Sequence, residues 1–237
     1  IMYSVKEICR YMANPTKGGR NKLKILGRYL KGNAWVAVKR PWQGEEKGIV
    51  GYSDSDLAGC RVTGKSTSGG ALMIGNHFIK AWARTQNHVT LSSAEAELYA
   101  MVKCTAELIG IKSMMHDWGR DKSGVLYADS TAVLGIAKRK GAGKLRHINI
   151  NTLWIQRVQE SEGVEYPNVL GNENPADLMT KYLTRDTVDK HMHAMGQEVR
   201  EGRAQIGFEM QGSQGGIQGE EGVTVRVAAV SRGRPAP

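Results

Sequence analysis

The pattern of apolar and polar positions changes several times along the chain, and each change predicts an element of secondary structure. Short apolar runs bounded by glycine or polar residues predict strands over 48–53, 69–75, 77–84, 124–128 and 164–170. Apolar residues at three- and four-residue spacing predict helices over 93–118, 130–137, 148–161 and 175–183. Elements in this order favour the α/β class, with a mixed sheet on which the helices pack.

The two ends of the chain differ from this central part. Residues 1–33 have helical periodicity and predict a short N-terminal segment of two helices. A polar stretch at 34–47, which opens with the strand-like W-V-A-V, predicts a linker to a main domain at 48–185. Residues 186–237 begin with a helix remnant. From about residue 198 glycine, glutamine and arginine dominate, which predicts a disordered tail.

The helix predicted to begin near residue 92 carries two glutamates in different settings. The sequence L-S-S-A-E-A-E-L-Y-A-M at 91–101 makes Ser92 the expected N-cap and Glu95 its capping-box partner. Glu97 lies in line with Met101, at the edge of the inward apolar stripe, whereas Glu95 falls off that stripe. A lone inward carboxylate is costly, so we expect Glu97 to meet a partner.

Three further acids stand at the ends of predicted elements. Asp54 and Asp129 follow predicted strands, and Asp177 lies at the third position of a helix that Asn174 is expected to cap. Sites in open α/β sheets gather at the carboxyl ends of strands. Carboxylates packed together repel one another unless a cation is present, and oxygen ligands suit Mg²⁺ or Mn²⁺ rather than zinc. Each acid alone is more simply a cap or turn residue, so the metal hypothesis depends on their joint placement.

Composition narrows the classes of partner. The formal net charge of +10 points to a polyanion, with nucleic acid first and an anionic membrane surface second. Cys9, Cys60 and Cys104 are far apart, which argues against a disulfide framework or a zinc site and fits a reducing compartment. No apolar run approaches the roughly 18 residues that span a bilayer, and no signal peptide is visible.

Four segments carry a resemblance to a known family. They are G-Y-S-D-S-D-L-A-G at 51–59, L-S-S-A-E-A-E-L-Y-A at 91–100, L-Y-A-D-S at 126–130 and N-P-A-D-L-M-T-K at 174–181. In this order and spacing they resemble the ribonuclease H domain of copia-type retrotransposon polyproteins. G-K-S-T-S-G at 64–69 is similar too, and the upstream R-Y-M-A-N-P-T-K and R-Y-L-K-G resemble the end of the reverse transcriptase region. Because the chain opens at Ile1 within a helical pattern, we expect it to be a piece of a longer polyprotein.

The resemblance implies a fold, an activity and a set of residues. The fold is RNase H-like, a five-stranded mixed sheet flanked by helices at 48–185, preceded at 1–33 by the C-terminal helices of the reverse transcriptase or connection region. The activity is endonucleolytic hydrolysis of the RNA strand of RNA–DNA hybrids during reverse transcription, with two Mg²⁺ ions for which Mn²⁺ can substitute. The implied catalytic and metal-binding residues are Asp54, Glu97, Asp129 and Asp177. Asp56 rivals Asp54, because strand alternation turns both to one face.

The resemblance also implies partners and a location. The partners are the RNA–DNA hybrid duplex and the reverse transcriptase domain of the same polyprotein, with no membrane. The location is intracellular, in a cytoplasmic retrotransposon particle.

A few positions depart from the family pattern. Leu57 replaces the usual tryptophan, and Asn149, Asn151, Leu153 and Gln156 stand where an acid and several basic residues are common. A catalytically decayed, nucleic-acid-binding remnant is therefore the alternative to an active enzyme.

Two basic stretches are candidates for phosphate contacts. The first contains Lys138, Arg139, Lys140, Lys144, Arg146 and His147, which form either a grip on the duplex or a solvated loop. The second, G-C-R-V-T-G-K-S at 59–66, matches the P-loop pattern, which requires a helix starting at Lys65. T-S-G-G and a strand-like A-L-M-I follow instead. A turn in which Lys65, Ser66 or Thr67 touches a phosphate is therefore favoured, and a P-loop NTPase is the remote alternative.

Overall fold

The computed structural model describes residues 1–33, 35–44, 48–141 and 153–200, together with the backbone of 223–228. The helices are α1 (Met2–Cys9), α2 (Lys17–Gly32), α3 (Ser93–Asp117), α4 (Thr131–Lys138), α5 (Trp154–Glu162) and α6 (Arg185–Ala194), with 3₁₀ helices η2 (Gly171–Glu173) and η3 (Pro175–Met179). The strands are β1 (Trp35–Arg40), β2 (Ile49–Asp56), β3 (Thr67–Ile74), β4 (His77–Thr85), β5 (Gly124–Tyr127), β6 (Val164–Glu165), β7 (Gln197–Arg200) and β8 (Val223–Ala228).

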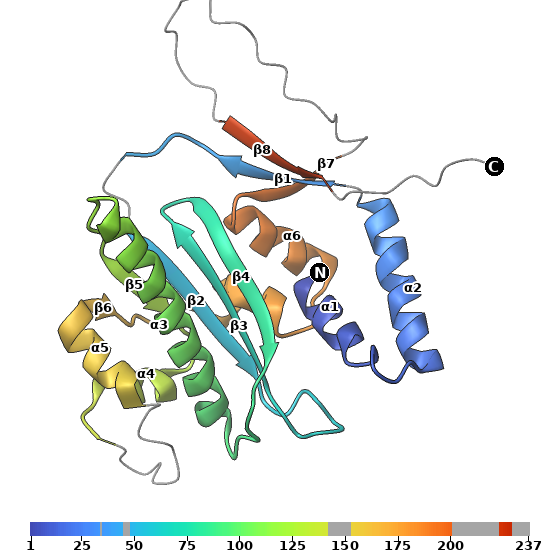
Figure 1. The fold of residues 1–237 in the computed structure, drawn as a ribbon, viewed down its shortest axis with the longest axis horizontal. Helices are drawn as coiled ribbons and strands as arrows, with labels where there is room; N and C mark the ends of the chain where they lie inside the picture. The colour runs from blue at the N-terminus through green and yellow to red at the C-terminus, as the bar shows by residue number, and fades with distance from the viewer. Residues whose placement is uncertain (34, 45–47, 142–152, 201–222, 229–237) are drawn as a thin grey trace, which may run out of the picture.

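The main sheet is five-stranded and mixed. Its strand order is β4-β3-β2-β5-β6, in which β2, β3 and β4 pair antiparallel and β5 is parallel to both β2 and β6. The hairpin between β3 and β4 turns at Gly75, whose φ of +56° suits glycine. This arrangement is the one that the ribonuclease H resemblance implies, so the predicted α/β fold is confirmed (Figure 1).

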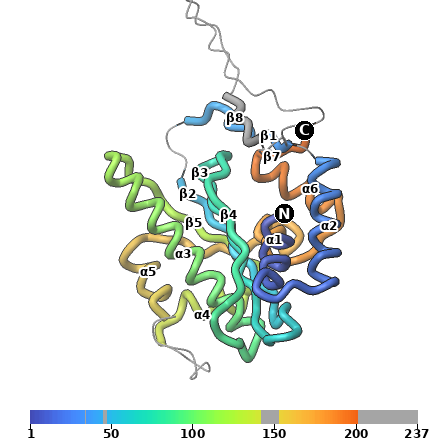
Figure 2. The backbone as a smooth tube through the Cα atoms, turned by 45° about the vertical axis from the view of Figure 1, so that its right-hand side comes forward, coloured from blue at the N-terminus to red at the C-terminus, as the bar shows by residue number. Residues whose placement is uncertain are grey.

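Helices cover both faces of this sheet. The long helix α3 crosses one face against β2, β3 and β5, and α4 and α5 pack beside it. The apolar core on this side includes Ile49, Leu72, Leu98, Met101, Leu108, Leu126 and Ile155. The other face is covered by η3 and α6, over a smaller core of Ala71, Met73, Met179 and Met195. Helix α1 lies against β4 and η3, and α2 lies outside α1 (Figure 2).

A second, three-stranded sheet lies beside the first, and it changes the picture of the chain ends. Strand β1, within the predicted linker, pairs antiparallel with β7 on one edge and with β8 on the other. The tail was predicted to be disordered, but 197–200 and 223–228 are strands. The sequence V-T-V-R-V-A at 223–228 has the period-two alternation of a strand. The prediction of disorder followed the glycine-rich composition around this segment and overlooked that local pattern. Residues 201–222 and 229–237 lie outside the described residues.

Other predicted elements are present with shifted boundaries. The helix expected over 175–183 is the short 3₁₀ helix η3, and the strand expected over 164–170 is reduced to β6 and a bridge between Ala128 and Asn168. The helix expected over 148–161 is described only as α5, because 142–152 lie outside the described residues. Among the described helices none is both long and apolar enough to cross a membrane.

Candidate metal centre

Three carboxylates meet at one end of the main sheet. One ligand oxygen from each of Asp54, Glu97 and Asp129 lies within 4.8 Å of the other two. Strands β2 and β5 run parallel and are paired up to Tyr52 and Tyr127. Asp54 and Asp129 each lie two residues beyond this last pair, so both stand at the same edge of the sheet. Within the described part of the chain, this is the only group of three or more acidic, histidine or cysteine side chains placed to hold a metal ion.

Asp54 is the most enclosed of the three acids. Its side chain is only 1% exposed. Thr180 donates its hydroxyl hydrogen to Oδ2 of Asp54, and Nζ of Lys181 lies 3.3 Å from Oδ1. These contacts fix the position of the carboxylate from the side of the sheet that η3 covers.

Two residues hold η3 close enough to reach Asp54. Asn174 is fully buried and caps η3 by accepting from the backbone N–H of Ala176 at 3.1 Å, while its Nδ2 donates to the carbonyl of Ser53 at 2.9 Å. Gly69 stands opposite Asp54 in β3. A Cβ there would lie 2.6 Å from Cγ2 of Thr180, so glycine allows the close approach.

Helix α3 brings Glu97 to the same place. Ser92 caps the helix as predicted, since its Oγ accepts from the backbone N–H of Glu95 at 3.2 Å. The return bond of Glu95 goes to the N–H of Leu91 at 2.7 Å, one residue earlier than a capping box requires. Glu95 is also buried, contrary to the prediction from periodicity, because it folds back onto this entering segment.

The sequence predicted that the inward-facing Glu97 would meet a partner, and in the structure it lies beside Asp54 and Asp129. Its Oε1 accepts from the backbone N–H of Ser55 at 3.2 Å. Its Oε2 is buried and has no hydrogen-bond partner among the described residues. A buried carboxylate oxygen without a donor is unfavourable, which leaves this atom available to a ligand.

The three carboxylates of the cluster repel one another when they are ionised. Burial raises the pKa of Asp54 to about 7, an effect that Lys181 and Thr180 partly offset. Burial, followed by the negative charges of Asp54 and Asp129, raises the pKa of Glu97 to about 8. Because three such groups resist ionising together, a divalent cation among them would relieve the repulsion. Their oxygen-only donor set suits Mg²⁺ or Mn²⁺, so the residues fit the predicted ions.

The fourth predicted ligand lies beside this group rather than within it. Oδ1 of Asp177 is 2.8 Å from Nζ of Lys181, the same ammonium that contacts Asp54. Burial disfavours the charged form of Lys181, but Asp54 and Asp177 outweigh that effect and raise its pKa. Lys181 thus bridges the buried Asp54 and the more peripheral Asp177.

The structure distinguishes Asp54 from Asp56, the other candidate ligand in the same strand. Oδ1 of Asp56 accepts from the backbone N–H of Thr67 at 2.6 Å, and its other oxygen faces Gly59, where a Cβ would collide with it. Asp56 therefore organises the turn at 57–66 and does not join the three-carboxylate group.

The residues of the turn that were predicted to touch phosphate lie in different settings. Ser66 is buried, and its Oγ accepts from the N–H of Ala58 at 3.0 Å. Thr67 is also buried, and its hydroxyl accepts from Lys6 at 2.6 Å. The side chain of Ser66 thus serves the turn at 57–66 and that of Thr67 contacts α1, whereas Lys65 is half-buried. Contact of these residues with phosphate stays a prediction. Strand β3 begins directly after this turn, so the helix that a P-loop needs is absent here and that interpretation is wrong.

The basic stretch near α4 is only partly described. Lys138 and Lys140 are exposed, Lys140 lies 3.1 Å from Glu160, and Arg139 is half-buried. Lys144, Arg146 and His147 lie outside the described residues.

The departures from the family pattern include one residue with a clear local role. The side chain of Gln156 accepts from the backbone N–H of Gly141 at 3.0 Å and donates to the carbonyl of Ile136 at 2.9 Å. It therefore links α5 to the end of α4. Leu153 packs against the larger core, Leu57 is 47% exposed, and Asn149 and Asn151 lie outside the described residues.

Thr180 and Lys181 are site residues that were not predicted from the sequence, and Asn174 was predicted only as a helix cap. The available signal was their position in the continuous segment N-P-A-D-L-M-T-K around Asp177.

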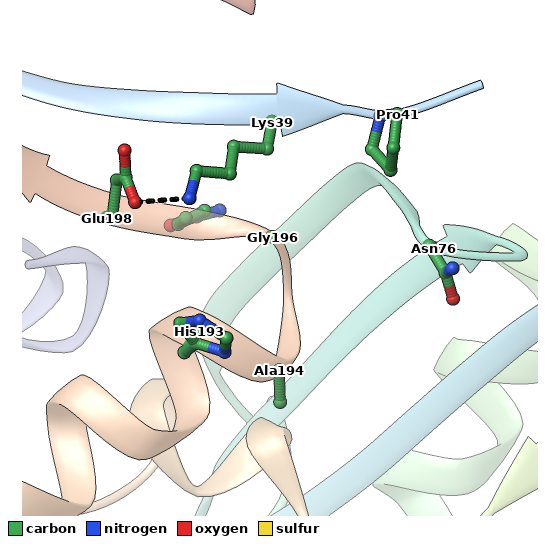
Figure 3. Close-up of a pocket in the computed structure, with 8 residues that line it drawn as sticks. Lys39, Pro41, Asn76, His193, Ala194, Gly196 and Glu198 are labelled. Carbon is green, nitrogen blue, oxygen red and sulfur yellow. Dashed lines mark ion pairs between the residues drawn. The ribbon is translucent and has the colours of Figure 1, made fainter. Parts of the chain in front are cut away.

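A separate pocket lies away from the carboxylates. It is formed where the turn between α6 and β7 faces β1 and the β3–β4 hairpin, and the ion pair between Lys39 and Glu198, at 2.6 Å, spans it (Figure 3). His193 and Asn76 also line it. This pocket contains none of the candidate metal ligands.

Comparisons of the sequence with known proteins give consistent relatives. No family model matches the chain. The chain is 29% identical over 188 residues to the retrovirus-related Pol polyprotein from transposon TNT 1-94 of Nicotiana tabacum, which covers 78% of this chain and 14% of that protein. It is 27% identical over 201 residues to the corresponding polyprotein from transposon RE1 of Arabidopsis thaliana, covering 83% and 14%. The chain thus spans about one seventh of these relatives, and the predicted relationship to retrotransposon Pol polyproteins is confirmed.

Solved structures similar to the chain include LC11-RNase H1, isolated from compost by a metagenomic approach. The match has 14% sequence identity and a TM-score of 0.46, and it covers 62% of this chain and 99% of that one. The same enzyme in complex with an RNA/DNA hybrid matches at 14% identity with a TM-score of 0.41, over 55% of this chain and 92% of that one.

Proposed function

We propose that the chain, a homologue of the Pol polyproteins of plant transposons, is a ribonuclease H-type endonuclease that hydrolyses the RNA strand of RNA–DNA hybrids. The observation that carries the proposal is the meeting of Asp54, Glu97 and Asp129 at the carboxyl ends of β2 and β5. The likeness to retrovirus-related Pol polyproteins of plant transposons supports it, because the four sequence motifs resemble that kind of polyprotein.

The chain's own residues prepare a site for two divalent cations. Asp54 is held between Thr180 and Lys181, and Glu97 is held by the N–H of Ser55 with its second oxygen free for a ligand. Bound Mg²⁺ or Mn²⁺ would supply activation of a water molecule and stabilisation of the leaving oxygen of a phosphodiester. The three carboxylates would hold these ions, and Asp177 would contribute from the edge once Lys181 moves from it.

The proposed substrate follows from the overall charge. A net charge of +10 favours a polyanion, and contacts to phosphates would position the duplex without a sequence preference. Selection of RNA over DNA would depend on the 2′-hydroxyl. We further propose that the reverse transcriptase domain of the same polyprotein is a partner, and that the chain acts in an intracellular retrotransposon particle.

The test is cleavage of a labelled RNA–DNA hybrid in Mg²⁺ by the wild type and two matched variants. Asp54→Asn removes a proposed ligand, whereas Asp56→Asn changes a neighbouring acid that lies outside the cluster. We expect Asp54→Asn to abolish cleavage and Asp56→Asn to retain it at an equal amount of folded protein. Equal rates for the wild type and Asp54→Asn would refute the proposal.

The same assay decides the alternative of a decayed, nucleic-acid-binding remnant. That alternative rests on the replaced residues after position 148, of which Gln156 has a structural role. Tight binding of the hybrid with no metal-dependent cleavage by the wild type would favour it.

A further inference from the structure

Helix α2 carries an unusual arrangement of charge. Over its 16 residues it has six cations and no acid, and the chain from 8 to 44 contains no acidic residue at all. Five of the six cations recur at spacings of three, four, four and three residues, namely Lys17, Arg20, Lys24, Arg28 and Lys31. At 3.6 residues per turn they fall within about 80° of one another, so they form one stripe along the helix. We call these five residues the α2 cation stripe.

The stripe is exposed, and no acid in the described part of the chain neutralises it. All five residues are exposed, and none forms an ion pair with an acid among the described residues. Like charges three and four positions apart on a helix are destabilising. A stripe that weakens its own helix and pairs with no acid among the described residues is complementary to an external polyanion.

The opposite side of α2 attaches the helix to the domain. Gly19 is buried against the ring of Tyr11, and a Cβ at Gly19 would lie 2.8 Å from that ring. Helix α1 in turn contacts the main sheet, since Lys6 donates to the hydroxyl of Thr67 at 2.6 Å. Thr67 is paired with Asp56 at the end of β2 that also carries the metal centre. The hairpin of α1 and α2 is therefore anchored at that edge of the sheet, with α2 outermost (Figures 1 and 2).

The dimensions of the stripe suit a nucleic acid backbone. From Lys17 to Lys31 the helix rises about 21 Å, with a cation every 4.5 to 6 Å or so. A duplex carries one phosphate per about 3.4 Å along each strand, so a strand of about six phosphates runs the length of the stripe. We propose that the α2 cation stripe is a second binding surface for a nucleic acid duplex, which grips the phosphate backbone beside the metal centre.

The place of the helix in the fold favours a nucleic acid over a membrane surface. The hairpin of α1 and α2 is anchored at the edge of the sheet that carries the metal centre. An interfacial helix buries its apolar side in the lipid. On α2 the residues Leu23, Ile25, Tyr29 and Leu30 are 40 to 65% exposed, so anionic vesicles are included in the test as the competing surface. The proposal concerns binding alone and holds whether or not the chain cleaves its substrate.

The test compares two triple variants with the same change in net charge. The first, Arg20→Gln, Lys24→Gln and Arg28→Gln, removes the middle of the stripe. The second, Lys80→Gln, Lys103→Gln and Lys112→Gln, removes three cations near α3 that pair with Glu107 or Glu162. Binding of a labelled RNA–DNA hybrid of about 20 base pairs is measured by fluorescence anisotropy in EDTA, from about 50 to 200 mM salt, which excludes cleavage.

The expected result is specific to the stripe. The first variant should bind about tenfold or more weakly at low salt, and the slope of log K against log salt should fall by about 2 to 3. The second variant should bind like the wild type. Glutamine keeps helix propensity, so thermal melting should show the first variant to be no less stable than the wild type. Unchanged binding by the first variant, an equal loss by both, or retention on anionic phosphatidylserine vesicles in preference to the hybrid would overturn the proposal.

Discussion

Replacing Glu97 by glutamine should stabilise the metal-free protein at alkaline pH while it abolishes cleavage. Glutamine keeps the shape of the side chain, and its oxygen can still accept from the N–H of Ser55. It removes one of three negative charges whose ligand atoms lie within 4.8 Å of one another. At alkaline pH the substitution therefore takes away a repulsion that a bound cation would otherwise relieve.

The magnitude follows from the pKa of Glu97. That pKa is raised from 4.5 to about 8 in the folded protein. A group with a raised folded pKa holds its proton in the native state after the unfolded chain has lost it. The free energy of unfolding therefore falls, by about 1.4 kcal/mol per pH unit, as the pH rises between these two values. The full shift corresponds to about 5 kcal/mol, and relaxation and water penetration at a site near the surface should leave about 2 to 3 kcal/mol.

The assay is urea unfolding in EDTA at several pH values from 5 to 9, with the wild type and Glu97→Gln side by side. At pH 5 the wild-type glutamic acid is neutral, so the two proteins should have similar unfolding free energies. The variant should become the more stable of the two as the pH rises toward 8. At pH 8 Mg²⁺ should stabilise the wild type and have little effect on the variant. A difference in unfolding free energy that does not change with pH would refute this account of the cluster.

Three other substitutions test the supports of the centre. Glu95→Ala should lower the free energy of unfolding in urea by about 1 kcal/mol, because the hydrogen bond to the N–H of Leu91 is lost, and cleavage of the hybrid should be retained. Loss of cleavage would show that Glu95 does more than secure the start of the helix. Lys181→Met should lower the unfolding free energy by about 1 to 3 kcal/mol in EDTA, because Asp54 and Asp177 lose the ammonium that they share. Mg²⁺ should restore part of that stability. Equal stability of the variant and the wild type in EDTA would contradict the bridging role of Lys181. Gly69→Ala should destabilise the protein by about 1 to 3 kcal/mol and slow cleavage, because the added methyl group forces η3 to move. The control is Gly135→Ala, which has open space around it and should be neutral or stabilising in thermal melts. Similar behaviour of the two variants would exclude the close approach at Gly69.

The sequence predicted the fold well where local and long-range preferences agree. The long helix has a capping serine and apolar residues at helical spacing, and it was predicted over 93–118 against Ser93–Asp117 in the structure. Boundaries were less accurate where packing decides them. The segment after Asn174 has a helical pattern, but it forms only the short 3₁₀ helix η3, which lies close against Gly69.

The three carboxylates that meet in the candidate site were among the residues predicted from the sequence, whereas the residues that hold them in place were not. Periodicity separated Glu97 from Glu95, although burial of both shows that a stripe argument ignores segments folding back onto a helix. The alternation of side chains along the strand could not decide between Asp54 and Asp56, because it turns both side chains to the same face. The choice depended on which neighbour each acid finds, Thr180 for one and the N–H of Thr67 for the other. Such contacts join residues more than ten positions apart and have no period in the sequence.

The three-carboxylate group is the centre of the whole account, and bound metal tests it most directly. Crystals soaked in Mn²⁺ and measured for anomalous scattering should show density about 2.0 to 2.2 Å from oxygens of Asp54, Glu97 and Asp129. Crystals of the Asp54→Asn variant, treated in the same way, should lose that density while the fold is unchanged. An absence of anomalous density at these carboxylates in the wild type, at Mn²⁺ concentrations that support cleavage, would contradict the account.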